Sequence, residues 1–233
     1  MSTIDRRQTC LPSLVSGQRL DRPTFHARYA AMPPKTRAEL IGGVVHMPSP
    51  LGSDHGLTDW SVSGWLFHYA RFTPGTSGAN NSSVFLGDWG EPQPDCLLLI
   101  LPEFGGQSRI EDGFFAGAPE LVVEVARSSR GIDLGVKKAD YERAGVPEYL
   151  VVVRDPDEIF WHVLRDGRYV LLPPEADGLY RSEVFPGLWL DPGALFARDL
   201  NGLIATLDQG LAIREHAEFV ARLGQMRVPL VDL

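Results

Sequence analysis

The sequence predicts a protein of the α/β class, on the evidence of two strands and the helix between them. The short apolar runs 120–126 and 149–154 have the length and the valine content of strands buried on both faces of a sheet. A helix of about 134–144 is expected between these runs, because Asp133 can cap its first turn and Gly145 can end it. A strand, a helix and a strand in this order form a β-α-β unit with parallel strands.

The other elements follow from apolar patterns and turn residues. Residues 94–101 are predicted to form a third buried strand, and the Arg165-Asp166-Gly167 turn predicts a hairpin, since glycine tolerates a positive φ. The remaining predictions are helices at 21–31, 56–70 and 199–223 (broken near Gly210), a hairpin or bent strand at 37–47 around Gly42 and Gly43, and irregular segments at 73–83 and 102–119. The chain then comprises a loose tail at 1–20, one domain at 21–198 and a helical extension at 199–233.

Composition restricts the class of function. The chain has 233 residues and a formal net charge of −8, which argues against a broad basic surface that coats nucleic acid but leaves room for a local contact patch. No apolar run is long enough to cross a bilayer, and Met1–Gln18 lacks the apolar region of a signal peptide. The two cysteines, Cys10 and Cys96, fall in the expected tail and in an expected core strand. We therefore expect a cytoplasmic protein with no membrane partner, no disulfide framework and no zinc site.

Two carboxylates stand where apolar residues are expected. Glu124 lies inside the strand 120–126, and burying its charge is costly unless a partner or a cation compensates it. The alternatives are that Glu124 faces solvent or pairs with an arginine. Asp95 begins the strand 94–101, where a residue at a strand-edge turn is the simpler explanation. Together, two carboxylates on neighbouring buried strands can converge on one point, and such hard oxygen ligands suit Mg²⁺ or Mn²⁺.

Lys137 is the third candidate. It lies in the first turn of the expected helix, near the carboxyl end of the strand that contains Glu124, where α/β proteins bind ligands. There it could contact a phosphate oxygen or an attacking water, although most lysines are simply exposed. The neighbouring Lys138 points about 100° away, whereas Lys137 shares a helix face with Tyr141, four residues later. A tyrosine facing the sheet favours Lys137 over Lys138.

Three segments in this order resemble the Uma2 family, also called DUF820. They are QPDCLLLI at 93–100, PELVVEVARSS at 119–129 and DLGVKKADYERAGVPEYLVV at 133–152, and AELIGGVVHMPSP at 38–50 and FPGLWLDPGALF at 185–196 match the family as well. The resemblance covers roughly residues 20–200, and the order and spacing of the motifs make it specific. It implies a PD-(D/E)XK fold of the restriction-endonuclease kind, with a mixed sheet flanked by helices and one metal site.

The resemblance also implies roles for individual residues. Asp95 and Glu124 become metal ligands, while Ala126 stands where the parent motif has its lysine, so Lys137 from the following helix takes that part. Glu39 and His55 are secondary candidates, Glu39 as a further or water-mediated ligand. Without the resemblance, Glu39 could equally face solvent, and His55 is more simply a cap or loop residue.

Two departures from the family pattern concern loops. The usual Ser-Pro-Ser stretch after the strand reads 126–129 Ala-Arg-Ser-Ser, and Gly42 stands where an acidic residue is common. The first departure puts the local loop in doubt rather than the metal site.

The expected function is a metal-dependent endonuclease that hydrolyses phosphodiester bonds of nucleic acid, with DNA as the expected partner. Asp95 and Glu124 would hold Mg²⁺ or Mn²⁺, with the backbone carbonyl of Val125 as a candidate third ligand. Two alternatives stay open: a non-catalytic binding or dimerisation module on the same fold, and a hydrolase of another phosphorylated substrate. A homodimer is also left open. Because two metal-free carboxylates repel each other, Glu124→Gln is predicted to raise the melting temperature in EDTA.

Overall fold

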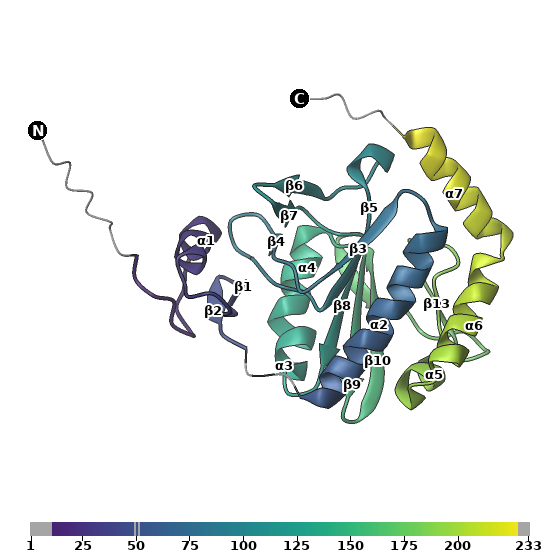
Figure 1. Ribbon diagram of the computed structural model, residues 1–233, viewed down its shortest axis with the longest axis horizontal. Helices are drawn as coiled ribbons and strands as arrows, with labels where there is room; N and C mark the ends of the chain where they lie inside the picture. The colour runs from purple at the N-terminus through teal and green to yellow at the C-terminus, as the bar shows by residue number, and fades with distance from the viewer. Residues whose placement is uncertain (1–10, 49, 51, 228–233) are drawn as a thin grey trace, which may run out of the picture.

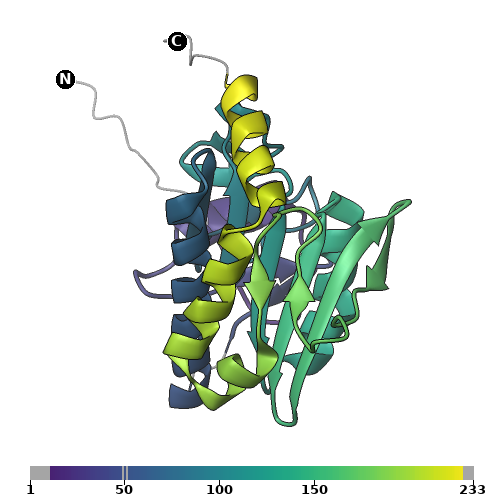
Figure 2. The same cartoon turned by 90° about the vertical axis from the view of Figure 1, so that its right-hand side faces the viewer.

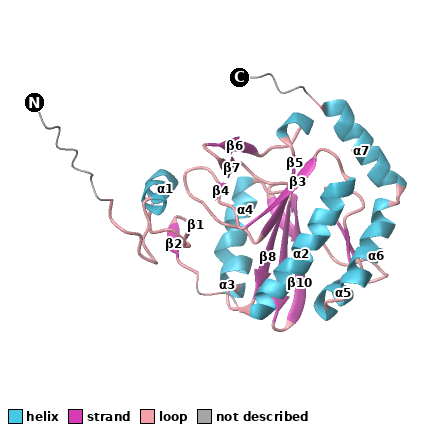
Figure 3. Cartoon of the chain, in the orientation of Figure 1, coloured by secondary structure: helices cyan, strands magenta, loops and turns pink. Residues whose placement is uncertain are grey.

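The structure is a computed structural model that describes residues 11–48, 50 and 52–227. Its centre is a six-stranded mixed sheet with the strand order β11-β10-β9-β8-β5-β3. The strands of this sheet are β3 (Thr76–Asn80), β5 (Cys96–Ile100), β8 (Leu121–Ala126), β9 (Glu148–Arg154), β10 (Asp157–Arg165) and β11 (Arg168–Leu171). β8 and β9 run parallel and every other neighbouring pair is antiparallel, which confirms the predicted mixed sheet flanked by helices (Figure 3).

Helices cover both faces of this sheet, as Figure 1 shows. α2 (Ser53–Phe72) packs on one face with α5 (Pro192–Ala197), α6 (Leu200–Leu211) and α7 (Arg214–Met226), around buried side chains such as Trp65, Leu150 and Leu203. α4 (Lys138–Ala144) covers the other face through Tyr141, which packs with Val122 and Val151. Successive strand residues point to opposite faces, so the apolar runs of β8 and β9 serve both cores.

A smaller layer lies beside the main sheet. α1 (Arg22–Ala30) and the hairpin of β1 (Glu39–Ile41) and β2 (Val44–His46) form its N-terminal part, with a core around Phe25, Leu40 and Val45. In Figure 1 these elements lie on the opposite side of the molecule from α5–α7. The other short elements are β4 (Val84–Phe85), η1 (Pro102–Phe104), β6 (Arg109–Glu111), β7 (Phe114–Ala116), α3 (Arg130–Ile132), η2 (Asp133–Lys137), β12 (Tyr180–Arg181) and β13 (Trp189–Leu190).

The sequence prediction was wrong for two segments and incomplete at both ends. The predicted loop 73–83 contains β3, whose sequence TSGAN is too polar to show a strand pattern because it lies at the sheet edge. The irregular segment 102–119 contains η1 and the β6–β7 hairpin. Gly17 and Gln18, expected in a loose tail, exchange backbone hydrogen bonds with Val45 of β2, and α6 and α7 contribute to the main core. Cys10 lies outside the described residues, and Cys96 is a buried free thiol.

No helix in the described part of the chain is both long enough and apolar enough to cross a membrane.

Candidate active site

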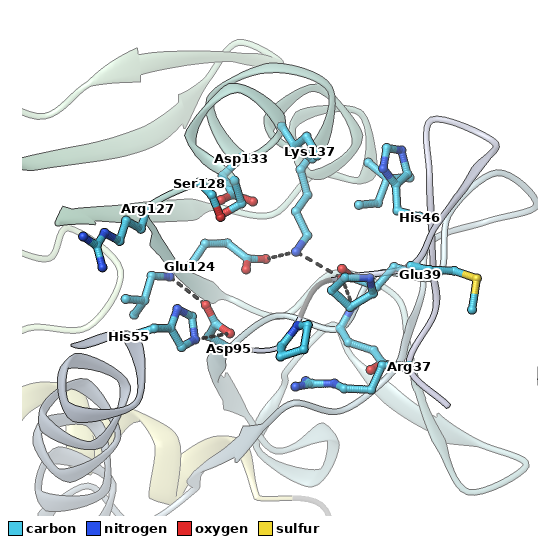
Figure 4. Close-up of a pocket in the computed structure, with 18 of the residues that line it drawn as sticks. Arg37, Glu39, His46, His55, Asp95, Glu124, Arg127, Ser128, Asp133 and Lys137 are labelled. Atoms are coloured by element: carbon cyan, nitrogen blue, oxygen red, sulfur yellow. Dashed lines mark hydrogen bonds and ion pairs between the residues drawn. The ribbon is translucent and has the colours of Figure 1, made fainter. Parts of the chain in front are cut away.

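A pocket of roughly 430 Å³ opens at the carboxyl end of β8. Its wall is completed by the first turn of α2, by the β1–β2 hairpin and by the turn that leads from β8 into α3 and η2. Figure 4 shows that the side chains of Glu39, His55, Asp95, Glu124 and Lys137, which come from these segments, point toward one another. The polar and charged lining residues include Arg37, Glu39, His46, His55, Asp95, Glu124, Arg127, Asp133 and Lys137.

Asp95 and Glu124 lie on the same face of the sheet. β5 and β8 are antiparallel with Cys96 opposite Val123, so Asp95, one residue before Cys96, falls opposite Glu124. Oδ2 of Asp95 accepts a hydrogen bond of 2.7 Å from the backbone N–H of Val125, which ties the end of β5 to β8. The strand register therefore brings the two predicted carboxylates together.

Lys137 forms ion pairs with two of the carboxylates in the pocket. Its side chain is 5% exposed, and Nζ lies 2.9 Å from Oε1 of Glu124 and 3.1 Å from Oε1 of Glu39. The hydroxyl of Tyr141 donates a 3.0 Å hydrogen bond to the same Oε1 of Glu124. Lys137 and Tyr141 thus meet Glu124 from one helix face, as their spacing predicted.

The charge states of this pair follow from burial and from neighbouring charges. Burial raises the pKa of Glu124, the Lys137 ammonium opposes this shift, and Asp95 adds to it. Burial alone would lower the pKa of Lys137, but the negative charges of Glu124 and Glu39 outweigh burial and raise it above its ordinary value. Lys137 is therefore an ammonium at neutral pH, which makes it a donor and not a proton acceptor.

The helix that carries Lys137 starts earlier than the sequence predicted, and Asp133 is not its N-cap. The helical path begins at Arg130, and Asp133 has helical dihedral angles (φ −67°, ψ −42°). It opens the π-helical turn η2, in which Gly135 leaves helical geometry (φ −108°, ψ −106°). Such a turn adds a residue to the helical path, and here it aims Asp133, which is 3% exposed, into the pocket with Lys137. Burial raises the pKa of Asp133, and Lys137 opposes that shift.

Glu39 reaches the pocket because the β1–β2 hairpin is fastened to α4. Oδ2 of Asp140 accepts a hydrogen bond from the backbone N–H of Gly42 at the hairpin turn. Gly42 has a φ of +58°, which strains other residues, and a Cβ there would lie 2.7 Å from Val136 Cγ2, so Val136 would have to move. Glu39 itself also accepts a 2.7 Å hydrogen bond from the backbone N–H of Gln93.

His55 lies within the first turn of α2 and not in front of that helix, as the sequence had suggested. Its Nε2 is 3.3 Å from Oδ1 of Asp95. The hydrogen bond with Asp95 raises the pKa of His55, although burial opposes the shift. Asp95 is thus held on one side by the Val125 backbone and on the other by His55.

Three charged residues at the pocket were not predicted from the sequence. Asp133 was assigned to capping, although it lies four residues before Lys137 and hence on the same helix face. Arg127 follows the Glu124 strand directly, and its position just past the strand end was the available signal. Arg37 comes from the segment before β1 and hydrogen-bonds to the side chain of Asn81, a pairing that no local pattern indicates.

The pocket holds an excess of acidic groups. Glu39, Asp95, Glu124 and Asp133 line it, and Lys137 is the buried cation among them. In the described part of the chain, no three histidine, cysteine or acidic side chains are already arranged around a common metal position. Lys137 occupies the space between Glu39 and Glu124. The donor set suits a hard divalent cation, because carboxylate oxygens are the ligands such ions prefer.

Comparisons with known proteins agree on the family. The model of the Uma2 family, described as "Putative restriction endonuclease", matches residues 23–193. Among solved structures, the chain is similar to "a putative nuclease belonging to DUF820" from Anabaena variabilis, with 17% sequence identity and a TM-score of 0.56 over 73% of this chain and 96% of that one. At this identity the structural likeness shows the fold alone. A search of curated proteins found no match. Because the family model matches well over half of its residues, the chain belongs to the Uma2 family.

Proposed function

We propose that the chain is a metal-dependent endonuclease that hydrolyses phosphodiester bonds of nucleic acid, with DNA as its substrate. The observation that carries the proposal is the contact of the buried Lys137 with Glu124 and Glu39, beside Asp95, in one open pocket. Carboxylates at the end of a strand can bind a metal ion, and a lysine among them can donate hydrogen bonds to a phosphate group held by that ion. The family description supports nuclease activity.

Asp95 and Glu124 would hold Mg²⁺ or Mn²⁺, with the backbone carbonyl of Val125 as a third ligand. The four carboxylates that line the pocket exceed its three basic side chains, Arg37, Arg127 and Lys137, by one negative charge, which a divalent cation would offset. When bound, such an ion polarises a phosphate oxygen and lowers the pKa of water. Lys137 and Tyr141 both contact Oε1 of Glu124, so we expect Oε2 to be the metal ligand.

Lys137 would contact the phosphate or orient the attacking water. Its ammonium has three N–H donors, and two of them are taken by Glu124 and Glu39. We expect the third donor to stabilise negative charge that develops on the phosphate oxygens. Glu39 and Tyr141 act as positioning residues: Glu39 restrains Lys137, and Tyr141 fixes the carboxylate of Glu124.

The remaining residues of the pocket have positioning and binding roles. His55 holds Asp95 in place through the contact with its Oδ1. Arg127 and Arg37 both line the pocket, and Figure 4 shows them on opposite sides of Asp95, so we expect them to contact phosphates on either side of the scissile bond. These contacts position the backbone and read no base sequence.

The test is cleavage of supercoiled plasmid, single-stranded DNA and RNA by the purified chain with Mg²⁺, Mn²⁺ or EDTA. We expect cleavage that depends on the divalent ion and that Glu124→Ala and Lys137→Ala each reduce by about 10²–10³-fold. Lys138→Ala is the matched control, because it changes the neighbouring lysine, and it should retain most of the activity.

Other outcomes separate the alternatives. Binding of nucleic acid without cleavage in any metal would favour a non-catalytic module on this fold. Hydrolysis of small phosphoesters without cleavage of any polymer would favour a hydrolase of another phosphorylated substrate. Cleavage that Glu124→Ala leaves unchanged would place the reaction elsewhere in the molecule.

A further inference from the structure

The outward side of α2 is apolar, which is unusual for a helix that faces solvent. About three turns of this side present Gly56, Leu57, Trp60, Gly64 and Phe67, which together we call the α2 outer face. Trp60 is 70% exposed and Phe67 is 73% exposed. Among the described residues no element packs over this face, and Figures 1 and 2 show α2 at the outside of the molecule. Outward helix positions normally carry charged residues, so this uncharged row of residues with exposed aromatics indicates a binding site for another molecule.

No packing contact among the described residues requires a glycine at either of the two glycine positions of the α2 outer face. A Cβ added at Gly56 or at Gly64 would meet no atom within 4 Å. Glycine weakens a helix interior, and alanine would fit at both positions without any clash. The open space beside Gly56 and Gly64 would instead accommodate bulky side chains of a second molecule.

The strand next to α2 is an unprotected edge of the main sheet. β3 ends the sheet, and its sequence TSGAN contains neither a charged residue nor proline. The opposite edge strand, β11, contains Arg168 and follows Arg165, so that edge has the charges that discourage pairing. A groove of roughly 360 Å³ separates α2 from β3, and Phe67, Ala70, Ala79 and Asn80 are among its lining residues.

We propose that the α2 outer face and the β3 edge together form the interface with a second copy of this chain. A strand edge is self-complementary: about a two-fold axis, β3 can pair antiparallel with β3 of the second copy. The same axis brings the two α2 helices side by side, so the aromatics of one copy face the glycines and the groove of the other. Because α2 also carries His55, this interface would connect the two pockets through one helix from each copy.

Charge favours this occupant over others. The net charge of −8 opposes self-association, so two copies are expected to meet where like charges are absent, and the α2 outer face has no charged residue before Arg71. Nucleic acid and anionic membranes require clustered lysine or arginine, which this face lacks. The two aromatics would each bury on the order of 100–170 Å². A standard interface needs about 800 Å² per partner, so the β3 edge and the groove must contribute the larger part.

The experiment is the molar mass of the full chain in solution, measured by light scattering across a dilution series. We expect twice the chain mass of 25.7 kDa for the wild type. The Trp60→Glu and Phe67→Glu double variant should run as a monomer with an unchanged circular dichroism spectrum. Ile110→Glu is the matched control, because Ile110 is 63% exposed on the β6–β7 hairpin, away from this face, and the control should remain dimeric.

The Gly64→Arg variant tests the interface with a substitution that is not expected to destabilise the folded chain. The position is open in the single chain, and replacing a helix glycine favours the helix, so the variant should melt no lower than the wild type. We expect it to shift the dimer dissociation constant upward by at least 10-fold, since the arginine blocks the approach of the second α2. A monomeric wild type at all concentrations would overturn the proposal, and so would a dimer that Gly64→Arg and the double variant both leave intact. None of these measurements depends on nuclease activity.

Discussion

Glu124 and Glu148 are both buried glutamates on neighbouring parallel strands, and their surroundings differ in kind. Glu148 is 0% exposed, and its carboxylate accepts hydrogen bonds from the Ser182 hydroxyl and the backbone N–H groups of Glu183 and Val184. Those are neutral donors that tie the 182–184 loop to β9. Glu124 is 3% exposed and contacts the Lys137 ammonium in a pocket that other carboxylates share.

This difference separates a structural carboxylate from a candidate site. Burial raises the pKa of both groups, and it raises that of Glu148 to about 7 even though Ser182 and the loop amides oppose the shift. Only for Glu124 do further carboxylates, Asp95 first among them, add to the shift. A buried acid alone therefore indicates little about function, whereas a buried acid among other acids and one lysine indicates a binding site.

The largest expected effect comes from removing the lysine. Lys137→Ala leaves Glu124 buried beside Glu39 and Asp133 without its cation, so the free energy of unfolding should fall by about 3–5 kcal/mol. Lys138→Ala, the adjacent control, should change it by less than about 0.5 kcal/mol. Urea unfolding at pH 7 measures both. Equal stability of Lys137→Ala and wild type would show that Glu124, like Glu148, does not depend on a buried cation.

A second experiment concerns the pH dependence that Glu148 contributes. Its folded pKa of about 7 lies above the ordinary value of 4.5, so between these values the folded state binds more protons than the unfolded state. Stability should then fall as the pH rises from 4.5 to 7, by up to about 3 kcal/mol. Glu148→Gln keeps an acceptor for the two loop amides and cannot ionise, so its advantage over wild type should grow with pH across this window. Unfolding curves at pH 5, 6, 7 and 8 test this, and a constant difference between the two proteins would contradict it.

The smallest expected effect concerns metal binding at Glu124. For a site with millimolar affinity, 10 mM Mg²⁺ should stabilise the wild type by about 1.4 kcal/mol. That corresponds to a rise in melting temperature of about 2–4 °C per kcal/mol. Glu124→Gln should respond less, because a ligand is lost. Melting curves in EDTA and in Mg²⁺ are the measurement, with Glu148→Gln as the control that responds like wild type, and equal responses of all three proteins would rule out Glu124 as a ligand.

The structure reverses one expectation for the metal-free protein. From two carboxylates alone, Glu124→Gln was expected to melt higher than wild type in EDTA. Because Lys137 pairs with Glu124 at 2.9 Å, the substitution removes an attraction as well as a repulsion. We now expect Glu124→Gln to melt lower than wild type in EDTA.

Local patterns in the sequence were sufficient for the elements that stand next to the site. The apolar runs of β8 and β9, the helix face shared by Lys137 and Tyr141, and the hairpin after β10 all depend on neighbours within a few residues. β3 escaped detection because an edge strand is only partly covered and needs no apolar alternation. The π-helical turn escaped because it depends on how Asp133 and Lys137 fit the pocket and not on helix propensity.

By itself the sequence determined the fold class, the family and the identity of Asp95, Glu124 and Lys137 as the residues that stand out. Each of these depends on charges placed within apolar runs or on motif order along the chain. Only the tertiary structure decided that Glu39 shares Lys137 with Glu124, that His55 and Val125 hold Asp95, and that Asp133 enters the pocket. Those contacts join segments far apart in the chain, and their geometry is set by strand register and by the docking of the β1–β2 hairpin on α4, which no local pattern specifies.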